Sequence, residues 1–171
     1  VAASSDVEDD GLRSWYRVGN FKDPDDLVTF VRALYTSKLP ELGLDVIRDI
    51  QLLTPTRKGP LGVNELNIEL QQLVQRELYG IDVPPVPANR RPMPLVHDKV
   101  IQRRNNYDLG VMNGTVGQVV AVDAKTGDLT VRFDGEDVRL SRSDGHLGHL
   151  DLAYALTIHQ TQGSEFPVAI V

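Results

Sequence analysis

The chain has 171 residues, of which 41% are apolar and none is cysteine, and its formal net charge is −6. This length and apolar content suit one or two globular domains. Without cysteine, these residues cannot form a disulfide framework, a Cys-ligated zinc site or a cysteine nucleophile. No apolar run approaches the ~18 residues that a membrane span requires, and the acidic start does not look like a signal peptide. We therefore expect a cytoplasmic protein without a membrane partner.

The negative charge is concentrated at the beginning of the chain. Residues 1–26 contain seven acidic and three basic side chains, and we expect residues 1–19 to form an acidic flexible tail. Between residues 88 and 107 the sign reverses, because five basic side chains accompany a single acid, Asp98. This stretch suits contact with phosphate groups, and a solvated basic loop is the alternative.

Three segments of the first half carry clear patterns. Asp23-Pro24-Asp25-Asp26 has the residues of a helix start, and apolar side chains follow at helical spacing to a predicted end before Pro40. Residues 49–55 form a short apolar run halted by proline, which predicts a buried strand. A Gly/Pro loop with two cations comes next, and the apolar spacing of residues 66–78 predicts a second amphipathic helix.

The second half changes character twice. The proline-rich residues 83–94 predict an extended boundary. Short strand patterns separated by tight turns follow, at 96–102, 116–122, 128–133 and 137–140. They predict a small antiparallel barrel over residues 93–149. The apolar runs 152–156 and 167–171 then predict buried strands around a polar segment, where open α/β sheets place ligand contacts.

This order of patterns predicts an α/β fold in which a parallel-sheet domain is interrupted by the antiparallel barrel. Two chemistries stay open on side-chain types alone. Ser164, His159 and Glu165 are the residue types of a hydrolase triad, but no Gly-x-Ser-x-Gly elbow surrounds the serine. His146 and His149 stand three residues apart without an evident third ligand, so we expect no metal site in this chain.

The polar segment is the most informative part of the sequence. Residues 155–167, ALTIHQTQGSEFP, resemble motif V of superfamily 1 helicases, in the form found in RecD-like 5′-to-3′ DNA helicases. Residues 49–62 resemble the motif IV region of that family. Residues 97–108, with Asn113 and Gly114, resemble the beginning of its small Src-homology-like barrel. The resemblance extends over roughly residues 20–171.

The resemblance implies the second RecA-like (P-loop NTPase-type) domain of an ATP-dependent DNA helicase, formed by residues 20–92 and 150–171 and incomplete at its C-terminal end. It implies ATP with magnesium as cofactor, and single-stranded DNA and the N-terminal RecA-like domain of the parent chain as partners. The other subunits of a nuclease–helicase complex are further candidate partners, which would connect the chain with DNA repair and recombination. Because these residues contain no Walker A or Walker B motif, we expect the fragment alone to be inactive and the magnesium ligands to lie in the missing N-terminal domain.

Motif V supplies candidate site residues by its resemblance. Thr157 and His159 match positions that hold the DNA backbone, and a hydroxyl and an imidazole N–H can each donate to a phosphate oxygen. Gly163 and Glu165 match positions that face the nucleotide. A carboxylate can accept from a ribose hydroxyl, and glycine permits a close approach of the backbone.

Two further groups of candidates lie outside motif V. Arg57 is the candidate catalytic residue, a cation that reaches the γ-phosphate of ATP across the domain cleft, and Lys58 is the competing choice. The alternative for both is an exposed loop cation. The candidates for DNA contact are Arg104, Asn105, Asn106 and Tyr107. Amides can bind backbone or bases and an aromatic ring can stack on a base, whereas the alternative is a turn with one packed tyrosine.

Two rival functions remain. The helicase portion of a conjugative relaxase uses closely similar motifs, and a relaxase domain upstream in the parent gene would identify it. A non-enzymatic β-barrel that binds protein or nucleic acid would rest on residues 110–150. Such a module has no use for a Thr-x-His-x-x-Gln-Gly-x-Glu junction, which favours the helicase.

Overall fold

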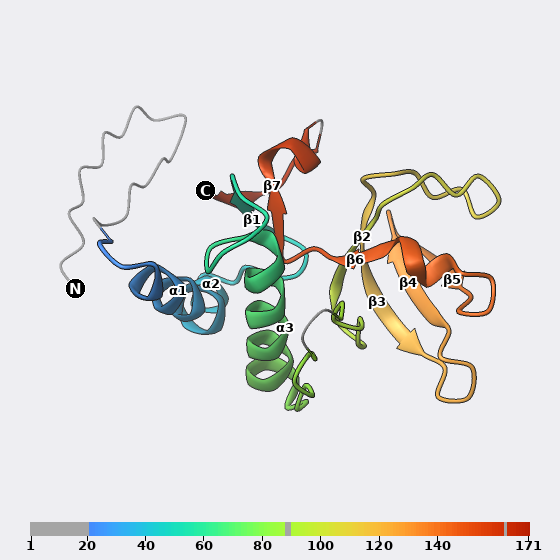
Figure 1. Cartoon of the computed structure of the whole chain (residues 1–171), viewed down its shortest axis with the longest axis horizontal. Helices are drawn as coiled ribbons and strands as arrows, with labels where there is room; N and C mark the ends of the chain where they lie inside the picture. Colours follow the sequence, from blue (N-terminus) through green and yellow to red (C-terminus); the bar gives the residue numbers. More distant parts are fainter. Residues whose placement is uncertain (1–20, 88–89, 163) are drawn as a thin grey trace.

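The computed structural model describes residues 21–87, 90–162 and 164–171. The expected acidic tail, residues 1–19, and the candidate Gly163 lie outside the described residues. Figure 1 shows two units side by side, one with helices and a three-stranded parallel sheet, the other built on a five-stranded antiparallel sheet. The predicted α/β class, with a parallel sheet and a separate antiparallel sheet, is confirmed. We call the two parts the parallel unit and the β unit.

The parallel unit begins with a helix whose start matches the sequence signal. Asp23 caps α1 (Pro24–Ala33) by accepting a hydrogen bond at 3.0 Å from a backbone N–H of the first turn. The helical path continues through a π-helical turn, Leu34–Lys38, into α2 (Leu39–Glu41), so the predicted end before Pro40 is wrong. Proline has no N–H and crowds the carbonyl four residues back, and the wider π turn accommodates both conditions.

Three strands form the parallel sheet. They are β1 (Ile50–Thr54), β7 (Ala155–Thr157) and β8 (Val168–Ile170). β1 is the central strand, with β7 on one side and β8 on the other. Because Thr54 lies opposite Thr157 in the register, the chain segments that follow β1 and β7 leave from the same edge of the sheet.

The second predicted helix, α3 (Val63–Tyr79), stands beside this sheet (Figure 1). Its buried leucine and valine side chains are Leu66, Leu70, Leu73 and Val74. Leu78 continues the same spacing but is 38% exposed, because the last turns extend beyond the short strands. None of the helices in the described ranges is long and apolar enough to cross a membrane.

The β unit has the strand order β5-β4-β3-β2-β6. Its strands are β2 (Lys99–Gln102), β3 (Val116–Val122), β4 (Leu129–Phe133), β5 (Glu136–Leu140) and β6 (Leu150–Leu152). All neighbouring strands are antiparallel, as the turn signals predict. Gly127 and Gly135, with φ of +72° and +90°, occupy the turns on either side of β4.

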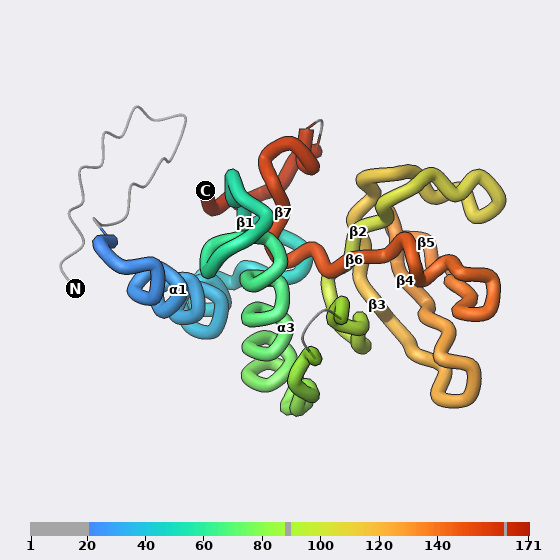
Figure 2. Tube along the Cα trace, in the orientation of Figure 1, coloured from blue at the N-terminus to red at the C-terminus, as the bar shows by residue number. Residues whose placement is uncertain are grey.

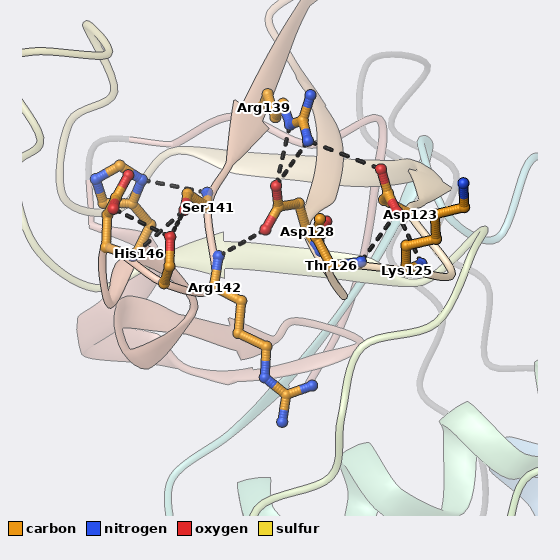
Figure 3. Close-up of polar contacts among 10 residues, drawn as sticks. Asp123, Lys125, Thr126, Asp128, Arg139, Ser141, Arg142 and His146 are labelled. Atoms are coloured by element: carbon orange, nitrogen blue, oxygen red, sulfur yellow. Dashed lines mark hydrogen bonds and ion pairs between the residues drawn. The ribbon is translucent and has the colours of Figure 1, made fainter.

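A polar cluster holds one end of the β unit (Figure 3). The Asp128 carboxylate accepts hydrogen bonds from the Arg139 guanidinium at 2.8 Å and from the backbone N–H of Arg142 at 3.0 Å. His146 belongs to the same cluster, since its Nδ1 accepts the N–H of Ser141 at 3.3 Å. The described residues contain no group of three or more His, Cys, Asp or Glu side chains placed to hold a metal ion. The hydrogen bond from Ser141 thus gives His146 a structural partner within the β unit.

The chain returns from the β unit to the parallel unit in only two residues, Ala153 and Tyr154 (Figure 2). The apolar run 152–156 predicted one buried strand, but its first residue ends β6 and its last two residues begin β7. All five residues are buried. A uniform apolar run carries no signal for a change of sheet, because either sheet can bury it.

Side chains of the parallel unit satisfy the backbone at this crossing. Gln51 Nε2 donates to the carbonyls of Ala153 at 3.1 Å and Tyr154 at 3.3 Å. On α3, Asn67 donates to the carbonyl of Ala155 at 2.8 Å and accepts its N–H at 3.0 Å, as a neighbouring strand would. Buried backbone groups without partners are costly, so these two amides make the abrupt crossing possible.

A buried carboxylate joins the two units next to the crossing. Asp98 accepts hydrogen bonds from Gln75 Nε2 at 2.6 Å, from the Tyr154 hydroxyl at 2.8 Å and from the Leu95 N–H at 2.7 Å. Gln71 Nε2 donates to the same group. Burial raises the pKa of Asp98, and these four donors oppose that rise by stabilising the charged form. Burial, with the nearby Asp98 charge, also raises the pKa of Tyr154, so its hydroxyl stays a donor.

Lys99, the next residue, is also buried, but its side chain contacts the parallel sheet. Its Nζ donates to the Ile50 carbonyl at 2.7 Å and lies 5.4 Å from the ring centroid of Phe166. Burial lowers the pKa of Lys99 to about 8, and the charges of Asp45 and Asp49 oppose this shift.

We expect Asp98→Ala to lower the free energy of unfolding by about 3 kcal/mol or more, because two glutamine amides and the Tyr154 hydroxyl lose a buried acceptor. Chemical denaturation of the 171-residue chain measures this difference. Asp82→Ala removes an exposed carboxylate and is expected to change stability by less than about 0.5 kcal/mol. Similar small losses for both variants would show that the carboxylate does not join the units.

Stability is expected to rise with pH through the titration of Lys99. Its pKa is about 8 in the folded chain against an ordinary value of 10.5, so the unfolded chain binds more protons between these pH values. The penalty for burying the ammonium is complete below pH 8 and disappears above pH 10.5, a gain of up to about 3 kcal/mol. Denaturation midpoints from pH 7 to 10 should show this rise in the wild type and in exposed Lys125→Met, but not in Lys99→Met.

Candidate functional site

The edge of the parallel sheet at which β1 and β7 end borders an open cleft of about 1100 Å³. Residues 113–116, Arg103 and Asp134 of the β unit line the cleft as well. The sequence-predicted site residues that line it are Arg57, Thr157, His159 and Glu165. The cleft thus brings together side chains from two motifs that are about a hundred residues apart in the sequence.

The loop that carries Arg57 is folded tightly against the start of α3. The Thr54 hydroxyl, at the end of β1, donates to the Leu61 carbonyl at 2.7 Å. A β-carbon at Gly62 would lie 2.6 Å from backbone atoms of Lys58, so this turn requires glycine. Arg57 and Lys58 are both exposed, but Lys58 is not among the residues that line the cleft. Of these two cations, only Arg57 lines the cleft.

A capping box shapes the segment after β7. The N–H and the hydroxyl of Thr157 both donate to Gln160 Oε1, at 2.8 and 2.9 Å, and start the short 3₁₀ helix Ile158–Thr161. This turn holds His159 exposed at the cleft. Because the Thr157 hydroxyl already donates to Gln160 Oε1, a phosphate oxygen would have to replace that acceptor to receive the hydrogen bond.

Ser164 and Glu165 are exposed and line the same cleft as His159. Among the residues that the structure describes, no hydrogen bond joins these three side chains. The alternative of a Ser/His/Glu hydrolase triad needs the serine and the carboxylate each bonded to the imidazole, and it has no support in this geometry. Glu165 remains an exposed acceptor at the cleft, as contact with a ribose hydroxyl requires.

The loop after β2 contains all four DNA-contact candidates, and two of them, Asn105 and Asn106, hold the loop itself. Asn105 Oδ1 accepts the N–H of Asn113 at 2.8 Å, and Asn106 Oδ1 accepts the N–H of Leu109 at 3.1 Å. These bonds match the turn alternative. Tyr107 is 76% exposed and accepts from Asn105 Nδ2 at 3.0 Å through its hydroxyl. Its ring is accessible for stacking, although it does not line the cleft.

Arg103 is the basic residue at the cleft that sequence reasoning missed. Its side chain is 27% exposed and pairs with Asp151 at 3.4 Å, whereas the candidate Arg104 lines only a second groove, described below. Successive residues of an extended chain point to opposite sides. This alternation beyond the end of β2 predicts that Arg103 and Arg104 point to opposite sides, so that only one of them faces the cleft.

Comparison with known proteins agrees with this picture. The family model described as the ATP-dependent RecD-like DNA helicase SH3 domain matches residues 66–133, from α3 through β4. The antiparallel strands β2, β3 and β4 therefore belong to an SH3-type domain, as the resemblance to a Src-homology-like barrel predicted.

Two curated relatives carry related names. The ATP-dependent RecD2 DNA helicase of Deinococcus radiodurans is 43% identical over 117 residues, which are 68% of this chain and 15% of that protein. The RecBCD enzyme subunit RecD of Mycobacterium tuberculosis is 32% identical over 125 residues, 73% of this chain and 20% of that protein. The chain thus spans a fifth or less of the length of these relatives.

Among solved structures, a Pif1 helicase from Bacteroides in complex with ADP-AlF3 and single-stranded DNA aligns with 85% of this chain and 38% of its own, at 17% identity and a TM-score of 0.48. The motif pattern, the SH3 family model and the curated relatives coincide on one group of proteins. Over 68% to 73% of its length the chain is similar to RecD-like DNA helicases, and its residues 66–133 match their SH3 domain.

Proposed function

We propose that this chain is part of an ATP-dependent 5′-to-3′ DNA helicase and that it supplies contacts to single-stranded DNA and to ATP across an interdomain cleft. One observation carries the proposal. The strands of motif IV and motif V, β1 and β7, are parallel neighbours, and the segments that follow them line one cleft. Carboxyl ends of parallel strands are where open α/β sheets bind ligands. The names of the two relatives, a DNA helicase and a RecBCD subunit, support the same class.

The proposal assigns residues 20–92 and 150–171 to a RecA-like domain and residues 93–149 to the inserted barrel. Because β6 pairs with β2, we propose that the barrel extends beyond residue 149 to Leu152 and that the junction is the crossing Ala153–Tyr154. The parent protein would add the N-terminal RecA-like domain with the Walker motifs. Other subunits of a nuclease–helicase complex and a cytoplasmic location belong to the same proposal.

DNA would be held through its backbone. His159 can donate an imidazole N–H to a phosphate oxygen, and Thr157 can donate its hydroxyl after exchanging Gln160 for that oxygen. Such contacts do not depend on base identity. A motor that moves along any sequence needs this kind of grip, and Tyr107 could add stacking on a base from the neighbouring loop.

ATP contact would come from the same edge of the sheet. The Arg57 guanidinium has no salt-bridge partner among the described residues, so it is available to a γ-phosphate held by the partner domain. Glu165 would accept from a ribose hydroxyl, and Gly163 is the remaining proposed nucleotide contact, whereas Lys58 stays the competing choice for the cation. We assign the magnesium ligands to the N-terminal domain of the parent protein, together with the Walker motifs.

Removal of the side chains proposed to donate to the DNA backbone should weaken the binding of single-stranded DNA. For the 171-residue chain we expect Thr157→Val and His159→Ala each to raise the Kd for a labelled oligothymidine by about 3- to 10-fold, the effect of one lost hydrogen bond to a charged group. Fluorescence anisotropy at low salt measures this. Thr29→Val, on the exposed side of α1, is the matched control. Unchanged affinity in both motif V variants would contradict the assigned DNA contact.

The role of Arg57 can be separated from that of its neighbour in the full-length protein. We expect Arg57→Ala to lower the kcat of DNA-stimulated ATP hydrolysis by at least about 100-fold, because transition-state charge loses a cation. Lys58→Ala removes the same charge one residue away and should change kcat by less than about 2-fold, since Lys58 does not line the cleft. The opposite result would assign the catalytic cation to Lys58, and two small effects would remove the motif IV loop from the ATP site.

A further inference from the structure

A second groove, of about 870 Å³, lies beside the cleft between the first half of α3 and the β unit. One wall comes from α3, with residues 63–65, 67 and 68, and another from the proline-rich segment, with residues 86, 87 and 90–92. The β unit provides the remaining wall with residues around β2 and β6. The groove therefore exists only because the β unit is held against α3.

The groove is strongly basic although the chain as a whole is acidic. Its charged lining residues are Arg57, Arg90, Arg91, Arg103 and Arg104, with only Glu65 and Asp151 of opposite sign. Asp151 is shared between Arg91 at 3.2 Å and Arg103 at 3.4 Å, so its charge is already neutralised. Among the described residues, Arg57, Arg90 and Arg104 form no salt bridge. These exposed cations favour the binding of an anion in the groove.

The remaining lining fits an elongated, amphipathic polyanion. Val63, Ile68 and Val86 are partly exposed apolar residues among those that line the groove, and Asn64 adds an exposed amide. Guanidinium groups bind phosphate oxygens bidentately, and an apolar surface accepts the sugar and base faces that a nucleic-acid strand presents between its phosphates. A nucleic-acid strand has this combination of charge and apolar surface.

The groove is continuous with the motif V cleft. Arg57, Arg103 and Gln160 line both spaces, so the cleft and the groove adjoin at these three residues. We propose that the groove is a second section of the track for single-stranded DNA, in which Arg90 and Arg104 bind phosphates beyond those held by Thr157 and His159. This inference rests on the proposed function and extends it by an additional binding segment.

The length of the oligonucleotide separates the two sections. An oligothymidine of ~4 nucleotides is the length of the shortest single-strand sites and fits the cleft, whereas one of ~12 nucleotides can occupy cleft and groove together. We expect Arg90→Ala/Arg104→Ala in the 171-residue chain to raise the Kd of the longer oligonucleotide about 10-fold and to leave the shorter one unchanged. The salt dependence, log K against log[salt], should become shallower by about 1.4, since each single-strand phosphate contact contributes about 0.7.

A charge-matched variant and a mononucleotide complete the experiment. Lys22→Ala/Lys125→Ala removes two exposed charges away from the groove and should change neither Kd by more than about 2-fold. Thymidine monophosphate should not compete for the length-dependent increment at concentrations below the millimolar range. Competition there would reveal a single-phosphate site and overturn the proposed track.

Other outcomes are equally decisive. Equal losses for both oligonucleotide lengths, or no loss, would overturn the groove inference while the motif V contacts stand. Absence of binding of either length by the wild-type chain would overturn the proposed DNA contact together with this inference. Thermal unfolding of each variant checks the fold, and Arg90→Lys/Arg104→Lys, which retains charge, should recover part of the salt dependence if folding is intact.

Discussion

The buried carboxylate of Asp98 is the constraint on which the rest of the structure depends. An anion removed from water without a cation beside it is tolerated only if donors surround it, and here the donors belong to α3, to the crossing and to the segment before β2. Apolar contact between the two units would allow small slides, because it is not directional. Hydrogen bonds to one carboxylate hold the β unit in one position on α3.

That position creates both candidate binding spaces. Thr157 and Arg57 come from the parallel unit, Arg103 comes from the β unit, and the cleft needs all of them at its rim. The groove likewise needs α3 on one wall and the ends of β2 and β6 on another. Gln51 and Asn67 reinforce this arrangement, because they hydrogen-bond the backbone carbonyl and N–H groups at the point where the chain changes sheets. Buried polar groups that a simple core would not require thus determine the geometry of the surface.

Local sequence patterns predicted the local structure. Features that depend on contacts distant in sequence were not predicted. The cap at Asp23, the apolar run of β1 and the turns of the β unit depend on neighbours within a few residues, so the sequence predicted them. The buried amides of Gln71 and Gln75 have the spacing and polarity of solvated helix positions, and nothing near them in the sequence indicates a carboxylate partner. Thr157 and His159 were predicted as site residues because they belong to a motif. Arg103 belongs to no such motif, and its place at the cleft depends on where the end of β2 lies in the fold.

The formal charge of −6 illustrates how little a sum determines about a binding surface. At physiological ionic strength the field of an exposed charge decays over about 8 Å, so acidic groups farther away contribute little to the potential inside the groove. Among the residues that line the groove, the arginines outnumber the acids, and Asp151 is already paired with Arg91 and Arg103. An acidic net charge opposes non-specific attraction to nucleic acid over most of the surface. Under the proposed function, a basic groove on such a surface would confine a DNA strand to one path, as a translocating motor requires.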